Sequence, residues 1–130
     1  MMNEPLDILR RFIDTANRHD PDAMLSCFAE EGYRAEYPAH PSRDFQGREQ
    51  VRRIHEQLFA GVPDLTVESL RSAVDGDVLW TEFEWRGTRR DGSRFLMRGP
   101  FLFGVRDGAF AWLRCYLEPV DVAAVAEGKP

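Results

Sequence analysis

The side chain best suited to proton transfer in this sequence is His55, because an imidazole gains and loses its proton near neutral pH. Helical spacing of the apolar residues over 48–59 places His55 beside Ile54 and Leu58 on the apolar face of a predicted helix. A histidine in that position is more often a core residue held by one hydrogen bond, with Tyr37 as the candidate partner. The sequence therefore offers a neutral base, and a purely structural histidine is the favoured alternative.

The remaining reactive side chains do not form a known catalytic or metal-binding pattern. Cys27 and Cys115 lie far apart, and no cation is placed to activate Cys115, so we expect it to be a small buried hydrophobe. The spacing of His19, His40 and His55 does not match a metal site such as HExxH. The sequence also contains no GxSxG nucleophile turn and no glycine-rich phosphate loop. We expect no metal and no other cofactor.

The hydrophobic pattern that predicts the positions of these groups changes from helical spacing to strand-type runs about half-way along the chain. Apolar residues at helical spacing predict helices over 4–18 and 48–59, and Asp20-Pro21 predicts the start of a short helix between them. Residues typical of strands then dominate four runs separated by Asp-Gly turns: 67–74, 78–86, 94–105 and 109–118. This order predicts an α+β domain in which three N-terminal helices pack on a curved, mainly antiparallel sheet.

Composition excludes several classes of function. The 130 residues are 43% hydrophobic and 30% charged, which predicts one domain over 1–130, with residues 121–130 as a mobile tail. A net charge of −5 disfavours binding to nucleic acid. The sequence shows no signal peptide and no apolar run long enough to span a membrane, so we expect a cytoplasmic protein without a membrane partner.

Six short motifs identify a family resemblance through their order and spacing. They are NRHDPDA (17–23), FQGREQ (45–50), VPDL (62–65), WRGT (85–88), VRDG (105–108) and RCYLE (114–118). With this order the chain resembles the NTF2-like superfamily, which includes ketosteroid isomerase and the SnoaL-like polyketide cyclases. The resemblance covers about residues 6–118 and implies a cone-shaped domain with a pocket for a small molecule.

The resemblance to ketosteroid isomerase, combined with strand alternation and the helix stripes, also implies which residues line this pocket. The predicted lining is Phe12, Ala16, Tyr37, His40, Ile54, His55, Leu58, Thr81, Phe83, Trp85, Arg98, Pro100, Leu113, Cys115 and Leu117. Within it we expect Tyr37, His55 and Arg98 to converge as the catalytic group. The sequence leaves open whether Glu118 or Cys115 faces the pocket.

The carboxylates that related enzymes use are missing from the matching positions. Tyr37, Phe12 and Pro100 occupy the positions of the base, the oxyanion tyrosine and the protonated aspartate of ketosteroid isomerase. Arg98 matches the arginine of limonene epoxide hydrolase, but Pro100 and Cys115 replace its two aspartates. Any catalysis would therefore use neutral His55 as the base, while Arg98 would hold an anionic group.

Three hypotheses for the function follow. The first is a SnoaL-like protein that binds a small apolar cyclic or aromatic molecule and isomerises or cyclises it with non-standard residues. The second is a non-catalytic ligand-binding or assembly module, and the third, less favoured, is an enzyme like limonene epoxide hydrolase. Several converging polar groups in the pocket would favour an enzyme, whereas a dry pocket with one polar group would favour binding alone.

We also predict a homodimer, as the resemblance implies. The outer face of the sheet would carry a patch of large side chains without a covering element, and the two sheets would pack together about a two-fold axis. The residues assigned to that face are Trp80, Phe101, Phe103, Trp112 and Tyr116.

Overall fold

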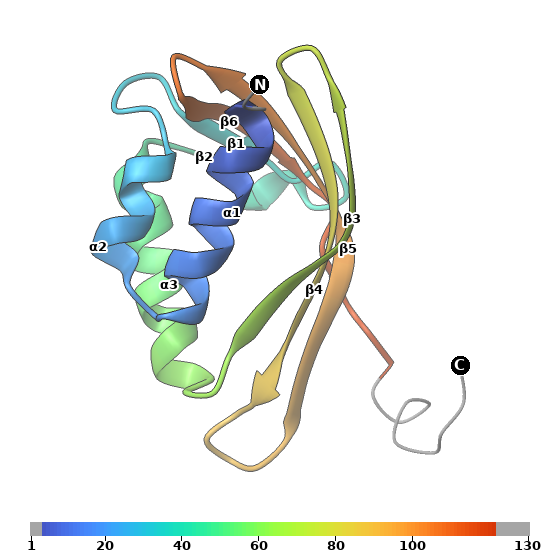
Figure 1. Cartoon of the computed structure of the whole chain (residues 1–130). Coiled ribbons are helices and arrows are strands. Elements are labelled where there is room, and N and C mark those ends of the chain that lie inside the picture. Colours follow the sequence, from blue (N-terminus) through green and yellow to red (C-terminus); the bar gives the residue numbers. More distant parts are fainter. Residues whose placement is uncertain (1–3, 122–130) are drawn as a thin grey trace.

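The computed structural model of the protein describes residues 4–121, in which a layer of helices packs against one curved sheet (Figure 1). The two long helices, each of 14 residues, are α1, Glu4–Asn17, and α3, Arg48–Gly61. Between them lie α2, Pro21–Met24, and the 3-10 turns η1, Leu25–Cys27, and η2, Pro41–Arg43. Except for Asp121, the predicted mobile tail lies outside the described residues. None of the helices within 4–121 is both long and apolar enough to cross a membrane.

The helices form where the sequence predicts them, because each combines an apolar stripe with a local start or stop signal. In α1, Ile8, Phe12 and Ala16 are buried toward the sheet. Asp20 caps α2 by accepting a hydrogen bond from the backbone amide of Ala23 at 3.0 Å. The helices therefore owe their position to burial of these stripes.

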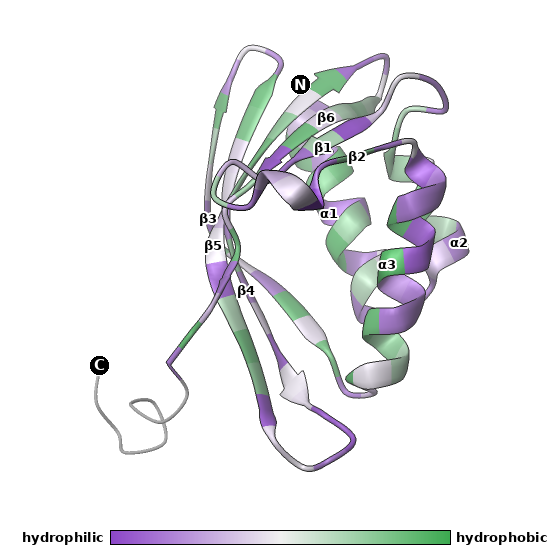
Figure 2. Ribbon diagram, turned by 180° about the vertical axis from the view of Figure 1, so that it is seen from behind, coloured by the Kyte–Doolittle hydropathy of each residue, from purple (hydrophilic) through white to green (hydrophobic). Residues whose placement is uncertain are grey.

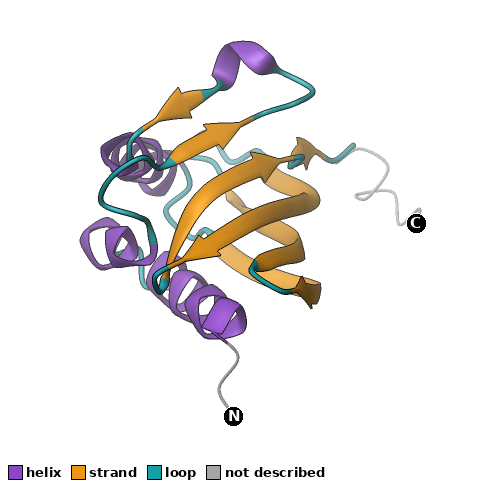
Figure 3. Cartoon of the chain, turned by 90° about the horizontal axis from the view of Figure 1, so that it is seen from above, coloured by secondary structure: helices purple, strands orange, loops and turns teal. Residues whose placement is uncertain are grey.

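Seven strands form one sheet in the order β2-β1-β6-β5-β4-β3, with β7 paired to β5. The strands are β1 (Arg34–Glu36), β2 (Phe45–Gln46), β3 (Thr66–Asp75), β4 (Val78–Thr88), β5 (Arg94–Arg106), β6 (Ala109–Cys115) and β7 (Glu118–Pro119). All pairs in this sheet are antiparallel except β1 with β6. Figure 3 shows the curved strands from above, with the helices to one side. The predicted α+β architecture is confirmed.

The last predicted strand, 109–118, is interrupted. After β6 ends at Cys115, the chain continues beside β5 in the same antiparallel register, and the backbone amide of Tyr116 donates to the carbonyl oxygen of Pro100 at 2.9 Å. The two residues of β7 then pair with Met97 and Arg98. The backbone of residues 116–117 can approach β5 this closely because β5 carries a glycine, Gly99, at the point of contact.

The register of β4 against β5 decides which side chains face the helices. Trp85 pairs with Met97, and Thr81 pairs with Phe101. Residues directly opposite on two neighbouring strands lie on the same face, so Met97 and Phe101 share the helix side with Trp85. Arg98 therefore lies on the outer face, and the predicted grouping of Arg98 with Trp85 is wrong. Alternation divides the residues of a strand into two faces, but it does not show which face turns toward the helices. A change of register by one residue exchanges the two faces.

The outer face of the sheet is correspondingly less aromatic than predicted. Phe101 and Phe103 were assigned to that face, but they are 5% and 0% exposed and belong to the hydrophobic core. Trp80, Trp112 and Tyr116 are half-buried. Figure 2 shows hydrophobic and hydrophilic residues alternating along the long strands, which agrees with one face turned to the core and one turned away. The homodimer stays a prediction, and these three residues are its basis.

The core is centred on Phe12 of α1. Its ring centre lies 5.9 Å from the ring centres of Phe28 and Phe83, 6.2 Å from that of Phe103 and 6.3 Å from that of Phe110. Aromatic side chains bury the largest apolar areas and prefer tilted or edge-on packing such as this. The cluster holds α1 against the sheet and forms the floor of the space below α3.

Candidate functional site

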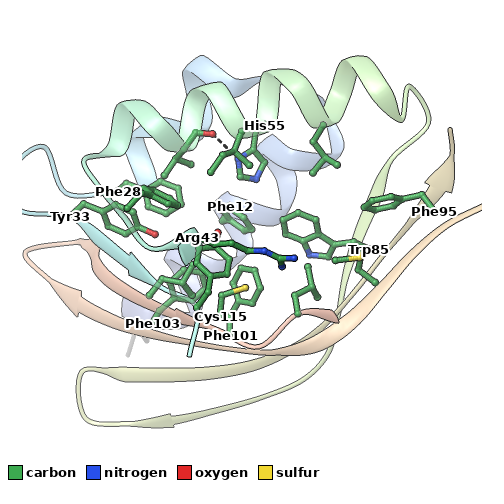
Figure 4. A pocket seen from close by; sticks show the side chains of 18 residues that line it. Phe12, Phe28, Tyr33, Arg43, His55, Trp85, Phe95, Phe101, Phe103 and Cys115 are labelled. Carbon is green, nitrogen blue, oxygen red and sulfur yellow. Dashed lines mark hydrogen bonds between the residues drawn. The ribbon is translucent and has the colours of Figure 1, made fainter. Parts of the chain in front are cut away.

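A cavity of about 240 Å³ lies between α3 and the helix-facing side of the sheet (Figure 4). Its walls are mostly apolar and aromatic, as in most small-molecule sites. The polar groups in the lining come from six residues: Tyr33, Tyr37, Arg43, His55, Trp85 and Cys115. These residues belong to segments far apart in the sequence, and only the folded chain brings them together.

Most of the predicted pocket residues line this cavity. They are Phe12, Tyr37, Ile54, His55, Leu58, Trp85, Leu113, Cys115 and Leu117. Two members of the predicted catalytic group, Tyr37 and His55, are therefore in one cavity, and Cys115 rather than Glu118 faces it.

The other predicted pocket residues lie elsewhere. Ala16 and Phe83 are enclosed in the core, at 1% and 0% exposure. The hydroxyl of Thr81 is hydrogen-bonded to the hydroxyls of Ser69 and Ser72 on β3, at 2.8 and 3.2 Å. Pro100, His40 and Arg98 are also absent from the lining.

Arg98 is the most consequential of these corrections. Its Nε donates to Oε2 of Glu84 on the neighbouring strand at 2.6 Å, and that hydrogen bond is the main reason why the pKa of Glu84 is lowered. The Arg98 side chain is 45% exposed and the Glu84 side chain 16% exposed. The Glu84 carboxylate already balances the charge of Arg98, so Arg98 does not bind a ligand in the cavity.

His40 belongs to the segment that connects β1 with β2. Its Nε2 lies 2.7 Å from Oε1 of Glu118, the first residue of β7. This contact joins the connecting segment to β7. The carboxylate of Glu118 is therefore already paired with His40.

Sequence reasoning missed several lining residues, and a cause can be named for four of them. Met97, Phe101 and Phe103 are missed because the sequence analysis turns the opposite face of β5 toward the helices. Arg43 lies in the connecting segment between two short strands, where neither helical nor strand spacing predicts the direction of a side chain. A correct register for the β4–β5 hairpin would have found the first group.

His55 lines the cavity and has one ring nitrogen without a partner among the described residues. Its Nδ1 lies 2.9 Å from the carbonyl oxygen of Val51, which can only accept, so Nδ1 carries the proton and Nε2 carries a free lone pair. Nε2 is buried and has no hydrogen-bond partner within residues 4–121. Burial also lowers the pKa of His55, which keeps the ring neutral at pH 7. The predicted hydrogen bond to Tyr37 is replaced by the bond to Val51, one turn earlier in α3.

Trp85 supplies the complementary unpaired group. Its Nε1–H is buried without a partner among the described residues, and its ring centre lies 5.8 Å from that of His55. A buried polar group without a partner costs about 1–3 kcal/mol. Both residues line the same apolar cavity, so a hydroxyl or carbonyl group bound there would be the partner that the two buried nitrogens lack.

Three further acidic groups in the lining stay protonated at neutral pH. Burial raises the pKa of Tyr37 to about 12 and that of Cys115 to about 11, and it raises the pKa of Tyr33 well above its ordinary value. Cys115 is therefore a poor nucleophile, as expected for a buried thiol. Within residues 4–121, no three His, Cys, Asp or Glu side chains gather where a metal ion could be held.

The neutral state of His55 predicts a pH-dependent stability. An unfolded histidine binds a proton below about pH 6.5, whereas folded His55 resists protonation because its pKa is lowered. Between those two pKa values the free energy of unfolding should fall as the pH falls, by up to about 1.4 kcal/mol per unit. Urea unfolding of the wild type and of His55→Gln between pH 7.5 and pH 5 measures this loss as the difference between two curves. Parallel curves would show that His55 is protonated equally in both states.

Comparison with known proteins identifies the fold. Residues 9–113 match the SnoaL-like domain family. A candidate SnoaL-like polyketide cyclase from Jannaschia sp. CCS1 is 21% identical with a TM-score of 0.74, and the match covers 95% of this chain and 89% of that one. A candidate isomerase from Bacillus subtilis is 19% identical with a TM-score of 0.78, and the match covers 99% and 98% of the two chains.

A third structure, a protein with a ketosteroid isomerase-like fold from Catenulispora acidiphila, was solved in complex with trimethylamine. It is 18% identical with a TM-score of 0.76, and the match covers 95% of this chain and 94% of that chain. No curated protein matches the chain by sequence. At these identities the solved structures show a common fold, and function must be argued from the cavity.

Proposed function

Because this chain belongs to the SnoaL-like domain family and folds as an NTF2-like cone, we propose that it binds a small apolar cyclic or aromatic molecule and transfers a proton of that molecule. The observation that carries the proposal is that two residues lining the cavity have buried nitrogens without a hydrogen-bond partner among residues 4–121, Nε2 of His55 and Nε1 of Trp85. The aromatic walls would hold a ring, while these two atoms would engage its oxygen or an acidic C–H group. The reaction type is an isomerisation or a cyclisation.

The chemistry of such a step follows from the two groups. Neutral His55 would accept a proton at Nε2 from a carbon next to a carbonyl, and the electrons of that C–H bond would form an enolate. The enolate oxygen would accept a hydrogen bond from Nε1–H of Trp85, which costs little reorganisation because the indole is already buried there. In an isomerisation His55 returns the proton to another carbon. In a cyclisation the enolate carbon bonds to a second carbonyl carbon, and the proton goes to the resulting alkoxide.

The competing hypotheses are distinguished by the polar groups. A non-catalytic module needs no base, and a mostly apolar cavity suits it, so binding without turnover is the second candidate. An epoxide hydrolase of the limonene type would need Arg98 between two carboxylates inside the cavity, and Arg98 instead lies outside it with Glu84.

A bicyclic ketone tests the proposed function directly. We expect 2-tetralone to bind in isothermal titration calorimetry, and we expect the protein to accelerate exchange of its α-hydrogens for deuterium in D₂O. His55→Gln should keep most of the binding and lose the acceleration, since general-base catalysis contributes about 10²–10⁴-fold. The wild-type rate should fall as the pH drops through the lowered pKa of His55. His19→Gln is the matched control, because that histidine lies outside the lining and is hydrogen-bonded to the carbonyl oxygen of Leu65.

Each outcome separates the hypotheses. Binding without accelerated exchange would contradict proton transfer and favour the binding module. Accelerated exchange that survives in His55→Gln would contradict the role of His55 as the base. Absence of binding, together with native mass spectra of the purified protein that show no bound small molecule, would contradict the proposed function as a whole.

A further inference from the structure

Arg43 is the one permanently charged side chain in the cavity lining of the described chain. It ends the 3-10 turn η2, in the segment that joins β1 to β2. Figure 4 shows its side chain reaching across the cavity, with the guanidinium directed toward Trp85. The residue as a whole remains exposed, so its charge lies at the opening, where the apolar interior meets water.

No carboxylate within residues 4–121 balances this charge at ion-pair distance. Asp44, the next residue, accepts a hydrogen bond from the backbone amide of Tyr37 at 2.6 Å, and Glu118, which like Arg43 acts on Cys115, pairs with His40 at 2.7 Å. Tyr37 and Cys115, on whose ionisation Arg43 acts, keep their protons at neutral pH because burial raises their pKa values. The cavity thus contains a cation at its opening and no anion to neutralise it.

The segment that carries Arg43 is held in place by its own contacts. The backbone amide of Arg43 donates to the carbonyl oxygen of His40 at 2.9 Å, and that of His40 donates to Tyr37 at 2.8 Å. The pair of His40 with Glu118 then ties the segment to β7. An arginine on a fixed backbone loses less freedom when it binds an anion, and its planar fork matches a carboxylate with two parallel hydrogen bonds.

We propose that the ligand is an organic acid, whose ring lies in the aromatic cavity and whose carboxylate is bound by Arg43 at the opening. This inference rests on the proposed function, which places the ring of the ligand in the cavity, and it adds a carboxylate to that ligand. Arg43 then takes the role that the sequence assigned to Arg98. It determines which of several apolar molecules of similar shape the protein selects.

The general charge of the protein does not favour this ligand. With a net charge of −5, the chain repels anions, so a preference for an acid over its neutral isostere must come from a local cation. That property allows a sharp comparison between two probes of the same shape, 1-naphthylacetate and 1-naphthylacetamide.

Titration calorimetry at pH 7 and low salt is the test. We expect the wild type to bind the acid about tenfold more tightly than the amide, and we expect added salt to reduce the difference. Arg43→Gln should abolish the preference and leave the affinity for the amide unchanged, whereas Arg43→Lys should retain part of it. Arg53→Gln is the matched control, because Arg53 is exposed on α3 and lies outside the cavity lining.

The outcomes separate this inference from the proposed function. Equal affinity for acid and amide in the wild type, or an unchanged preference in Arg43→Gln, would overturn the role of Arg43 while leaving ring binding intact. Failure of both probes and of 2-tetralone to bind would contradict the proposed function and this inference with it. Loss of the preference in both Arg43→Gln and Arg53→Gln would indicate a general charge effect and would also overturn the inference.

Discussion

Phe12→Ala is expected to lower the free energy of unfolding by about 3–5 kcal/mol, the range for removal of a fully buried phenylalanine. The side chain is 2% exposed and packs against the ring of Phe28, which follows η1, and against one phenylalanine ring each from β4, β5 and β6. Its loss therefore leaves a cavity that no single neighbour can fill. Because Phe12 also lines the ligand cavity, the same change enlarges that space. Urea unfolding followed by circular dichroism gives the difference in free energy.

Phe95→Ala provides the matched control for this prediction. Phe95 also lines the cavity, but it is only half-buried and packs beside the guanidinium of Arg89. Its removal should cost about 1–2 kcal/mol, within the usual range for a partly buried side chain. Equal losses for the two variants would show that the aromatic cluster around Phe12 is not the centre of the stability of the fold.

Gly99→Ala is expected to cost at least about 3 kcal/mol, because two independent penalties combine at this position. The φ angle of Gly99 is +149°, which side chains of L-residues rarely adopt, and an added Cβ would clash with the carbonyl oxygen of Tyr116. That oxygen is backbone and cannot rotate away. The substitution should therefore push residues 116–119 away from β5, and with them Leu117 in the cavity wall.

Gly76→Ala isolates the contribution of the clash. Gly76 has a φ angle of +61°, but nothing lies within 4 Å of an added Cβ. Only the backbone strain remains there, and it should cost about 1–2 kcal/mol. If thermal or urea unfolding gives the same loss for both variants, the close contact of Gly99 with Tyr116 does not constrain the sheet in the way the geometry indicates.

The sequence determined the elements of this fold to a large extent. The helical stripe of Ile8, Phe12 and Ala16, the cap at Asp20 and the Asp-Gly turns are local signals, and each acts through neighbours within a few residues. The position of His55 on the buried face of α3 follows from the same helical period. For that reason the architecture and the candidate base could be predicted.

The tertiary structure decided which charged group serves the cavity. Strand alternation shows that Arg98 and Met97 point in opposite directions, but only the pairing of Trp85 with Met97 shows which one turns inward. The tie between His40 and Glu118 joins residues 78 positions apart and places Arg43 at the opening. Pairing register and long-range contacts depend on the packing of the whole chain, because the energies that select between two faces of a strand come from neighbours that are distant in sequence.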